Sequence, residues 1–152
     1  ILSIPKNAKP VITNIWAGTD FSSASKKVFE VAEVLQTSTV AKVKGVHVYN
    51  VPLQFSPYIP KEHLDLKIEN HLKEKYEKFI KKIEYKGELT SEIIPGRDSG
   101  IAEKLRAKAT VAKVDLIIVA DKGRNTFSSL LVGSVTEELF NQDLEMPLWI
   151  VK

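Results

Sequence analysis

Short apolar runs alternate along the chain with segments in which apolar residues recur at helical spacing. Runs that are continuously apolar or rich in valine are typical of strands, and strands buried on both faces lack a polar alternation. Four such runs predict strands at Val11–Gly18, Val40–Val51, Leu116–Ala120 and Leu148–Val151, and Glu88–Ile94, which follows Gly87, can form a fifth.

The segments between these runs predict helices. One begins after Ser22 or Ser23, either of which can serve as its N-cap, and another follows Ser99. The longest, Lys61–Tyr85, has one apolar face, and the last runs from Ser134 to about Asn141. Strands that alternate with helices this regularly predict an α/β fold, here an open, doubly wound, five-stranded parallel sheet with helices on both faces.

Composition narrows the class of protein. With 152 residues the chain has the length of one domain, and its net charge of +3 is mild. No basic stripe with interleaved aromatic residues is present, so we expect no nucleic-acid partner. The absence of cysteine excludes thiol chemistry and disulfides. No apolar run approaches membrane-spanning length and no signal peptide opens the sequence, so we expect a cytoplasmic protein without direct membrane contact.

The two ends of the chain share a short pattern. Leu2-Ser3-Ile4-Pro5-Lys6 aligns loosely with Leu148-Trp149-Ile150-Val151-Lys152, although short apolar peptides often match by chance. One hypothesis is that residues 1–10 are a linker or the remnant of a preceding similar domain, with Asn7–Pro10 as the connection. Residues 11–152 then form the domain proper.

The segment from Asp115 to Val135 predicts a candidate anion site. A buried strand leads into a polar loop that contains Gly123, and a helix begins near Gly133 and Ser134. Amide groups in such a loop and at a helix start can bind phosphate, although an ordinary strand-to-helix connection has the same outline. Because ligands of α/β sheets bind beyond the carboxyl ends of strands where the strand order reverses, Asp20 could share this crevice.

The spacing within this segment identifies a family resemblance. Gly123, nine further residues and then Gly133-Ser134, together with Thr19-Asp20-Phe21-Ser22, resemble the universal stress protein family. The resemblance implies the family's fold and the binding of ATP or a related adenine nucleotide, with or without magnesium. It implies that the adenosine part contacts Asp20 and that the phosphates contact the loop glycines and the residues after them. The implied nucleotide-binding positions are Asp20, Ala120, Gly123, Gly133, Ser134 and Val135.

Two residues depart from the family pattern. Ala120 stands where the first motif glycine is expected, which matters if the site needs a positive φ or a contact too close for a methyl group. Asp121 would repel a triphosphate if it faced inward, whereas Lys122 and Arg124 could attract one or merely solvate the loop. A degenerate, empty site therefore remains an alternative.

Other roles compete for the same residues. Asp20 can cap the following helix, and Ser134 can be the N-cap of the last helix without contacting a ligand. No general base, catalytic triad or metal-ligand spacing is visible, so we expect a regulatory module with weak ATPase activity at most. The alternative is a dimerisation or interaction domain within a tandem or transporter-fused protein. The resemblance implies a homodimer or a tandem pair, and the apolar PLWIVK end offers a sheet edge for it.

Overall fold

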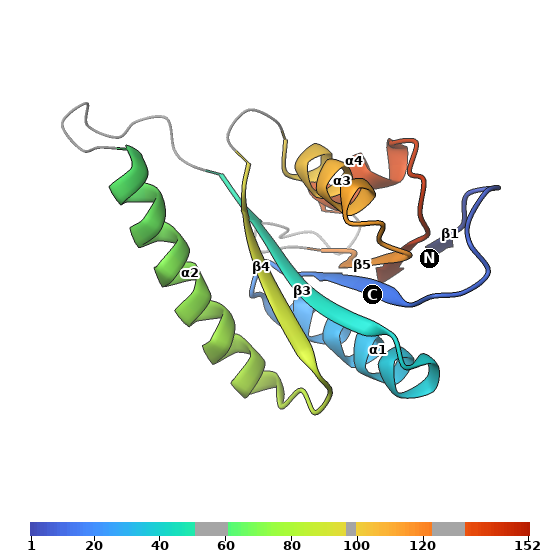
Figure 1. The fold of residues 1–152 in the computed structure, drawn as a ribbon, viewed down its shortest axis with the longest axis horizontal. Helices are drawn as coiled ribbons and strands as arrows, with labels where there is room; N and C mark the ends of the chain where they lie inside the picture. Colours follow the sequence, from blue (N-terminus) through green and yellow to red (C-terminus); the bar gives the residue numbers. More distant parts are fainter. Residues whose placement is uncertain (51–60, 97–99, 123–132) are drawn as a thin grey trace.

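The computed structural model describes residues 1–50, 61–96, 100–122 and 133–152, and the side chains of residues 61–64 are not described. Ten elements follow one another in the described residues (Figure 1). They are β1 (Leu2–Ser3), β2 (Asn14–Gly18), α1 (Ser23–Thr39), β3 (Lys42–Tyr49), α2 (Lys61–Ile83), β4 (Leu89–Pro95), α3 (Ile101–Val111), β5 (Leu116–Ala120), α4 (Ser134–Asn141) and β6 (Leu148–Val151). Strands and helices therefore alternate as the sequence predicts.

The strands form one sheet in the order β1-β6-β5-β2-β3-β4. All neighbouring strands run parallel except β1, which pairs antiparallel with β6. The doubly wound α/β fold is confirmed, but the sheet has six strands and not the five predicted. The additional strand has two residues, too few to give a period-2 pattern, and its pairing depends on a segment at the other end of the chain.

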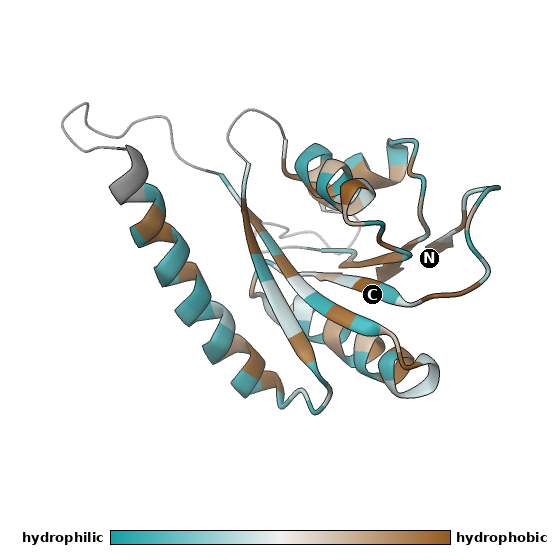
Figure 2. Cartoon of the chain, in the orientation of Figure 1, coloured by the Kyte–Doolittle hydropathy of each residue, from teal (hydrophilic) through white to brown (hydrophobic). Residues whose placement is uncertain are grey.

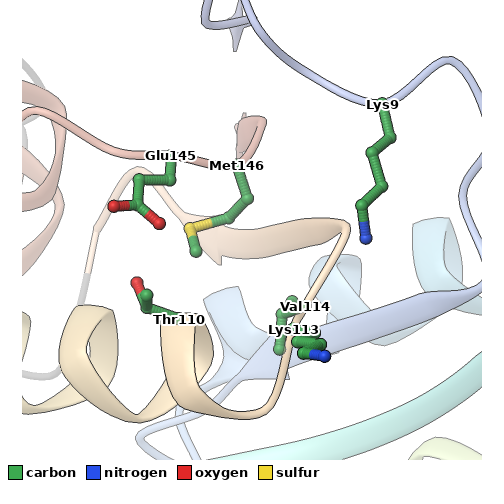
Figure 3. Close-up of a pocket in the computed structure, with 6 residues that line it drawn as sticks. All are labelled: Lys9, Thr110, Lys113, Val114, Glu145 and Met146. Atoms are coloured by element: carbon green, nitrogen blue, oxygen red, sulfur yellow. The ribbon is translucent and has the colours of Figure 1, made fainter.

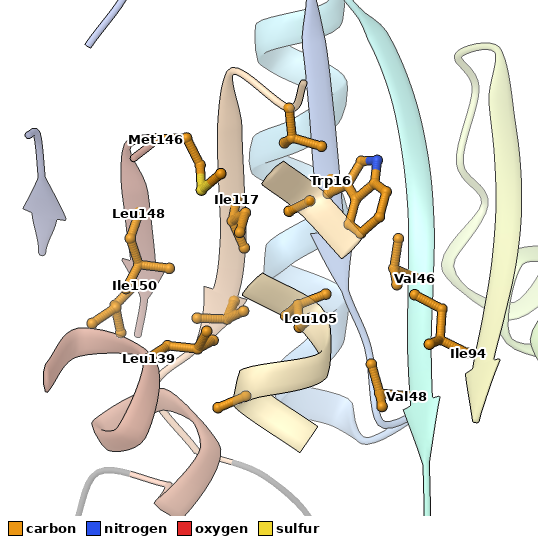
Figure 4. Packing of buried hydrophobic residues seen from close by; sticks show 14 residues of the cluster. Trp16, Val46, Val48, Ile94, Leu105, Ile117, Leu139, Met146, Leu148 and Ile150 are labelled. Atoms are coloured by element: carbon orange, nitrogen blue, oxygen red, sulfur yellow. The ribbon is translucent and has the colours of Figure 1, made fainter. Parts of the chain in front are cut away.

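Helices cover both faces of the sheet (Figure 1). Residues of α3 and α4 pack on one face, around Trp16, Ile117 and Leu105 (Figure 4). Residues of α1 and α2 pack on the other face, and Figure 2 shows many hydrophilic positions along α2. Among the described residues, no helix is long and apolar enough to cross a membrane.

Several element boundaries differ from the predicted ones for identifiable reasons. β2 begins at Asn14 and not at Val11, and the Thr13 amide just before it donates to the Asp115 carboxylate and not to a neighbouring strand. β3 begins after Val40, which ends α1 in the left-handed conformation with φ 59°. α2 likewise ends at Ile83, before the left-handed Glu84 (φ 57°), and so it ends earlier than predicted.

The packing of α2 on the sheet depends on a glycine in β3. A Cβ at Gly45 would lie 2.7 Å from Cζ of Tyr76, closer than side chains tolerate. Tyr76 is buried, and burial raises the pKa of its hydroxyl, with a smaller contribution from Tyr85. The glycine thus brings α2 close to the sheet, beside the loop that follows β2.

Candidate functional site

The strand order reverses between β2 and β5, which defines the expected crevice. From β2 the chain moves outward through β3 and β4, whereas β5 and β6 lie on the opposite side of β2. Ile15, Trp16 and Ala17 pair with Leu116, Ile117 and Ile118, so the two strands end side by side. A Cβ at Gly18 would lie 3.1 Å from Cγ1 of Val119, so the glycine permits this close approach. The carboxyl ends of β2 and β5 therefore meet, as the sequence predicts.

Asp20, one of the predicted site residues, lies half-buried in the loop after β2. Its Oδ1 accepts hydrogen bonds from the Ser22 amide (2.9 Å) and from the Ser25 hydroxyl (2.8 Å). Ser25 belongs to the first turn of α1, so Asp20 ties the loop to the start of the helix without accepting a first-turn amide as a cap would. Ser22 takes the N-cap position, but its side chain makes no cap hydrogen bond. Asp20 thus holds the N-cap residue and the Ser25 hydroxyl, whereas the side-chain capping bond expected of Ser22 is not made.

An aromatic group borders this loop, and the sequence analysis did not assign it to the site. Phe21 adopts a left-handed conformation with φ 64°, which is costly for a bulky side chain. Its amide donates to the Thr19 hydroxyl at 2.9 Å, and its ring lies 4.4 Å from that of His47. The Lys75 ammonium lies 5.1 Å from the Phe21 ring, within the range of a cation–π contact. The Thr-Asp-Phe-Ser motif was a usable signal for Phe21.

The partner of His47 determines its tautomer. Its Nδ1 lies 2.7 Å from the Thr19 carbonyl oxygen, which can only accept a hydrogen bond. Nδ1 must therefore carry the proton and donate it. His47 is half-buried between strand and loop. This bond ties β3 to the loop after β2.

The start of α4 is attached to the end of β5 by two hydrogen bonds. The buried Thr136 hydroxyl donates to the Ala120 carbonyl at 2.7 Å, and the Gly133 amide donates to the Asp121 carbonyl at 2.6 Å. The Asp121 amide donates in turn to Val151 at the end of β6 (2.8 Å). These bonds hold the helix N-terminus at the crevice, where its dipole favours an anion.

Gly133, and not Ser134, is the N-cap of α4. Gly133 has extended angles (φ −61°, ψ 142°), and Ser134 is the exposed first residue of the helix. The proposed capping role of Ser134 is therefore wrong, because a cap residue lies outside the helical conformation. The amides of Ser134 and Val135 belong to the first turn, where amides have no partner within the helix.

The structure shows whether the backbone at Ala120, which stands in place of a motif glycine, requires a glycine. Ala120 ends β5 and has no positive φ, so its backbone does not need glycine. Asp121 and Lys122 follow it and are half-buried. Gly123 and Arg124 lie outside the described residues. No cluster of metal-ligating side chains occurs in the described part of the chain.

A pocket of about 390 Å³ lies near the amino ends of β5 and β6, at the other end of these strands from the crevice (Figure 3). Its lining includes Thr110 at the end of α3, Val114 before β5 and Met146 before β6. These residues precede the strands, whereas ligands of this fold class bind beyond the carboxyl ends. The crevice between β2 and β5 is therefore the better candidate.

Comparisons with known proteins agree with this geometry. The model of the universal stress protein family matches residues 12–152. The structure of universal stress protein UspA from Lactobacillus plantarum is similar at a TM-score of 0.74, with 19% identity over 95% of this chain and 100% of that one. A universal stress protein in complex with cAMP is similar at 0.62, with 20% identity over 93% and 98% of the two chains.

A longer chain is also similar. Protein PA1789 from Pseudomonas aeruginosa PAO1, of unknown function, has a TM-score of 0.65 and 18% identity; the match covers 99% of this chain but 51% of that one. At these identities, the likeness to solved structures shows the fold. A comparison with curated proteins gave no match.

Proposed function

Because the chain belongs to the universal stress protein family, we propose that it is a regulatory module that binds ATP or a related adenine nucleotide. The proposed site is the crevice between the carboxyl ends of β2 and β5. The observation that carries the proposal is the attachment of the α4 N-terminus to the end of β5 through Thr136 and Gly133. A universal stress protein of the same fold forms a complex with cAMP, which supports an adenine nucleotide as ligand.

The two sides of the crevice suit different parts of a nucleotide. The first-turn amides of α4, at Ser134 and Val135, suit phosphate oxygens, because the helix dipole adds to their positive potential. Asp20, on the β2 side, suits a hydroxyl or amino donor of the adenosine part. The Gly133 amide is already bonded to the Asp121 carbonyl. We therefore assign the phosphate contacts to the amides of Ser134 and Val135. The role of Gly133, which has no side chain, is to let the phosphate come close to the backbone. The assignment of Gly123 and Ala120 to the site also remains part of this proposal.

Catalysis is not part of the proposed function beyond weak ATP hydrolysis. Magnesium would bind through the phosphates of the nucleotide. We further propose a cytoplasmic location, and a homodimer or tandem pair as the assembled form. The hypothesis that residues 1–10 derive from a preceding domain or linker stays a prediction. The antiparallel pairing of Leu2–Ser3 with Leu148–Trp149 is compatible with it.

An interaction domain with a degenerate pocket is the second candidate. Two protein groups that were expected to bind the nucleotide are instead hydrogen-bonded within the protein, which favours this candidate. Asp20 Oδ1 holds the start of α1, and the Gly133 amide holds the end of β5. In this alternative the crevice stabilises the fold and binds no nucleotide.

Titration calorimetry with ATP and magnesium separates the two candidates. Asp20→Asn retains an oxygen that can accept the Ser22 amide but removes the negative charge, so it separates ligand contact from the bond to Ser22. Gly133→Val adds bulk at the start of α4. Asp143→Asn, at an exposed position after α4, is the matched control. We expect binding by the unchanged protein and the control, and weaker binding by the two site variants.

Thermal unfolding of each variant accompanies the titration, so that a loss of binding is interpreted only for folded protein. The absence of heat and of any thermal shift at millimolar ATP, in a folded protein, would contradict nucleotide binding. Binding that Gly133→Val leaves unchanged would show that the ligand lies elsewhere.

A further inference from the structure

The pocket near the amino ends of β5 and β6 combines an apolar floor with charged groups of both signs. Its volume of about 390 Å³ lies within the range of roughly 300–1,000 Å³ that small-ligand sites occupy. Its lining consists of Lys9, Thr110, Lys113, Val114, Glu145 and Met146. We propose that this pocket binds a small dipolar molecule whose amino and carboxylate groups are separated by a short apolar chain. This site is separate from the proposed nucleotide crevice.

The floor of the pocket is apolar and fixed by packing. Val114, between α3 and β5, and Met146, before β6, are each 5% exposed. Both belong to the core cluster to which α3 and α4 contribute. Thr110, in the last turn of α3, is half-buried and also lines the pocket. This floor suits a hydrocarbon chain, because apolar area that leaves water on binding stabilises the complex.

The charged groups of the pocket stand on opposite sides of this floor. Figure 3 shows the Glu145 carboxylate on one side of Met146 and the ammonium groups of Lys9 and Lys113 on the other. Within the described part of the chain, neither Glu145 nor Lys113 forms an ion pair. A ligand with an amino group at one end and a carboxylate at the other therefore matches both sides. A molecule with a single kind of charge would match only one of them.

Lys9 can contact a ligand without loss to its present partner. Its Nζ lies 3.4 Å from Oδ1 of Asp115, longer than the roughly 2.7–2.9 Å of a strong charge-assisted hydrogen bond, and its side chain is 69% exposed. The Asp115 carboxylate also accepts the amides of Thr13 and Asn14 and the Thr13 hydroxyl. Asp115 therefore keeps three donors when Lys9 turns to a bound carboxylate.

Lys113 occupies a backbone position that usually holds glycine. It has a left-handed conformation with φ 52°, just after the C-terminus of α3. Its amide donates to the Thr110 carbonyl (3.1 Å) and the Val114 amide donates to the Ala109 carbonyl (3.0 Å), the two bonds of a Schellman motif. A side chain is costly in this conformation, although the helix dipole favours a cation at this end of α3. The lysine retained here lines the pocket with its ammonium group.

Met146 provides a direct reporter of binding, because it is the only methionine of the sequence. Methyl-labelled methionine places one NMR signal in the floor of the pocket, and Met146→Leu identifies that signal. Titration of the full chain with ε-aminocaproate, without nucleotide, gives a dissociation constant. Hexanoate and hexylamine each lack one of its charged ends. Norleucine is its isomer with both charges at the same end, so it tests whether the charges must be separated.

ε-Aminocaproate should shift the Met146 signal in a saturable manner. It should bind up to about fivefold more tightly than hexanoate, hexylamine or norleucine, since one exposed ion pair contributes that much. Glu145→Gln should abolish its advantage over hexanoate, and Lys113→Gln should reduce its advantage over hexylamine. The matched controls are Asp143→Asn and Lys108→Gln, which are exposed and outside the pocket lining, and they should leave the dissociation constant unchanged.

Thermal unfolding confirms that each variant is folded before its titration is interpreted. The absence of a saturable shift in the folded, unchanged protein would overturn the proposal. Equal dissociation constants for ε-aminocaproate and norleucine would overturn it as well, as would affinities that Glu145→Gln and Lys113→Gln leave unchanged. Because no nucleotide is present, these outcomes do not depend on whether the crevice between β2 and β5 binds one.

Discussion

Asp115 should be the side chain whose loss most weakens the attachment of β2 to β5. Its Oδ2 accepts hydrogen bonds from the amides of Thr13 and Asn14 (3.0 Å each) and from the Thr13 hydroxyl (2.8 Å). The carboxylate is 6% exposed, and the ammonium of Lys9 lies 3.4 Å away. Asp115→Ala leaves two amides without their acceptor, each at a cost of about 1–2 kcal/mol, so we expect a loss of roughly 2–4 kcal/mol in unfolding free energy.

The pH dependence of the unfolding free energy tests the role of Asp115 more sharply than the loss measured at one pH. Burial by itself would raise the pKa of Asp115, but the hydrogen bonds from Thr13 and Asn14 and the contact with Lys9 outweigh it, and the pKa is lowered. A carboxyl group with a lowered pKa in the folded state stabilises the protein fully above its unfolded pKa of about 3.9. This contribution is lost as the pH falls through the lower, folded value. The difference between the unchanged protein and Asp115→Ala should therefore shrink below about pH 4.

Urea unfolding followed by circular dichroism, at neutral pH and in steps down to about pH 3, measures this difference. Lys9→Ala is the control, because the Lys9 side chain is 69% exposed and its ion pair should contribute less than about 1 kcal/mol. A loss below about 1 kcal/mol for Asp115→Ala at neutral pH would refute the account. So would a difference that grows on acidification.

Three further predictions concern single contacts. Thr136→Val removes the 2.7 Å bond to the end of β5 and should cost about 1–2 kcal/mol in urea unfolding; if nucleotide binds at α4, the calorimetric affinity should fall as well. Gly45→Ala brings a Cβ within 2.7 Å of the Tyr76 ring and should lower the unfolding free energy by about 1–3 kcal/mol. An unchanged melting temperature would show that α2 can shift freely. Val40→Gly should stabilise by up to about 1 kcal/mol, because it relieves a left-handed valine that is 91% exposed; Val34→Gly, within the same helix, should instead lower the melting temperature.

The strands that are buried on both faces were predicted most reliably from the sequence. Leu116–Ala120 and Leu148–Val151 were assigned with the bounds that the structure shows, because buried parallel strands are continuously apolar. The beginning of the strand at Val11 was wrong, and the Thr13 amide before the strand donates to Asp115, a carboxylate distant in the sequence. The two residues of β1 likewise depend on a contact across the whole chain and give no local signal.

The crevice between the ends of β2 and β5 was predictable in position, and the residues around it less so in detail. Alternating strands and helices were sufficient to expect that β2, which Asp20 follows, and β5 end at the same edge of the sheet. The N-cap of α4 was misassigned by one residue, because backbone angles and not residue type decide which residue caps the helix. The contact of Phe21 with His47 joins the loop after β2 to β3, two segments that meet only in the folded protein, so the sequence pattern could not reveal it.

The pairing of β2 with β5 has a consequence for the order of folding. The segments on either side of this pair, β2 to β4 and β5 to β6, are each built from neighbours in the sequence, but Asn14 and Asp115 are 101 residues apart. Closing so long a loop is entropically costly, so this pairing should form late and limit the folding rate. A ligand that contacts both strand ends would then slow unfolding more than it speeds folding, because its site is assembled only after the rate-limiting step.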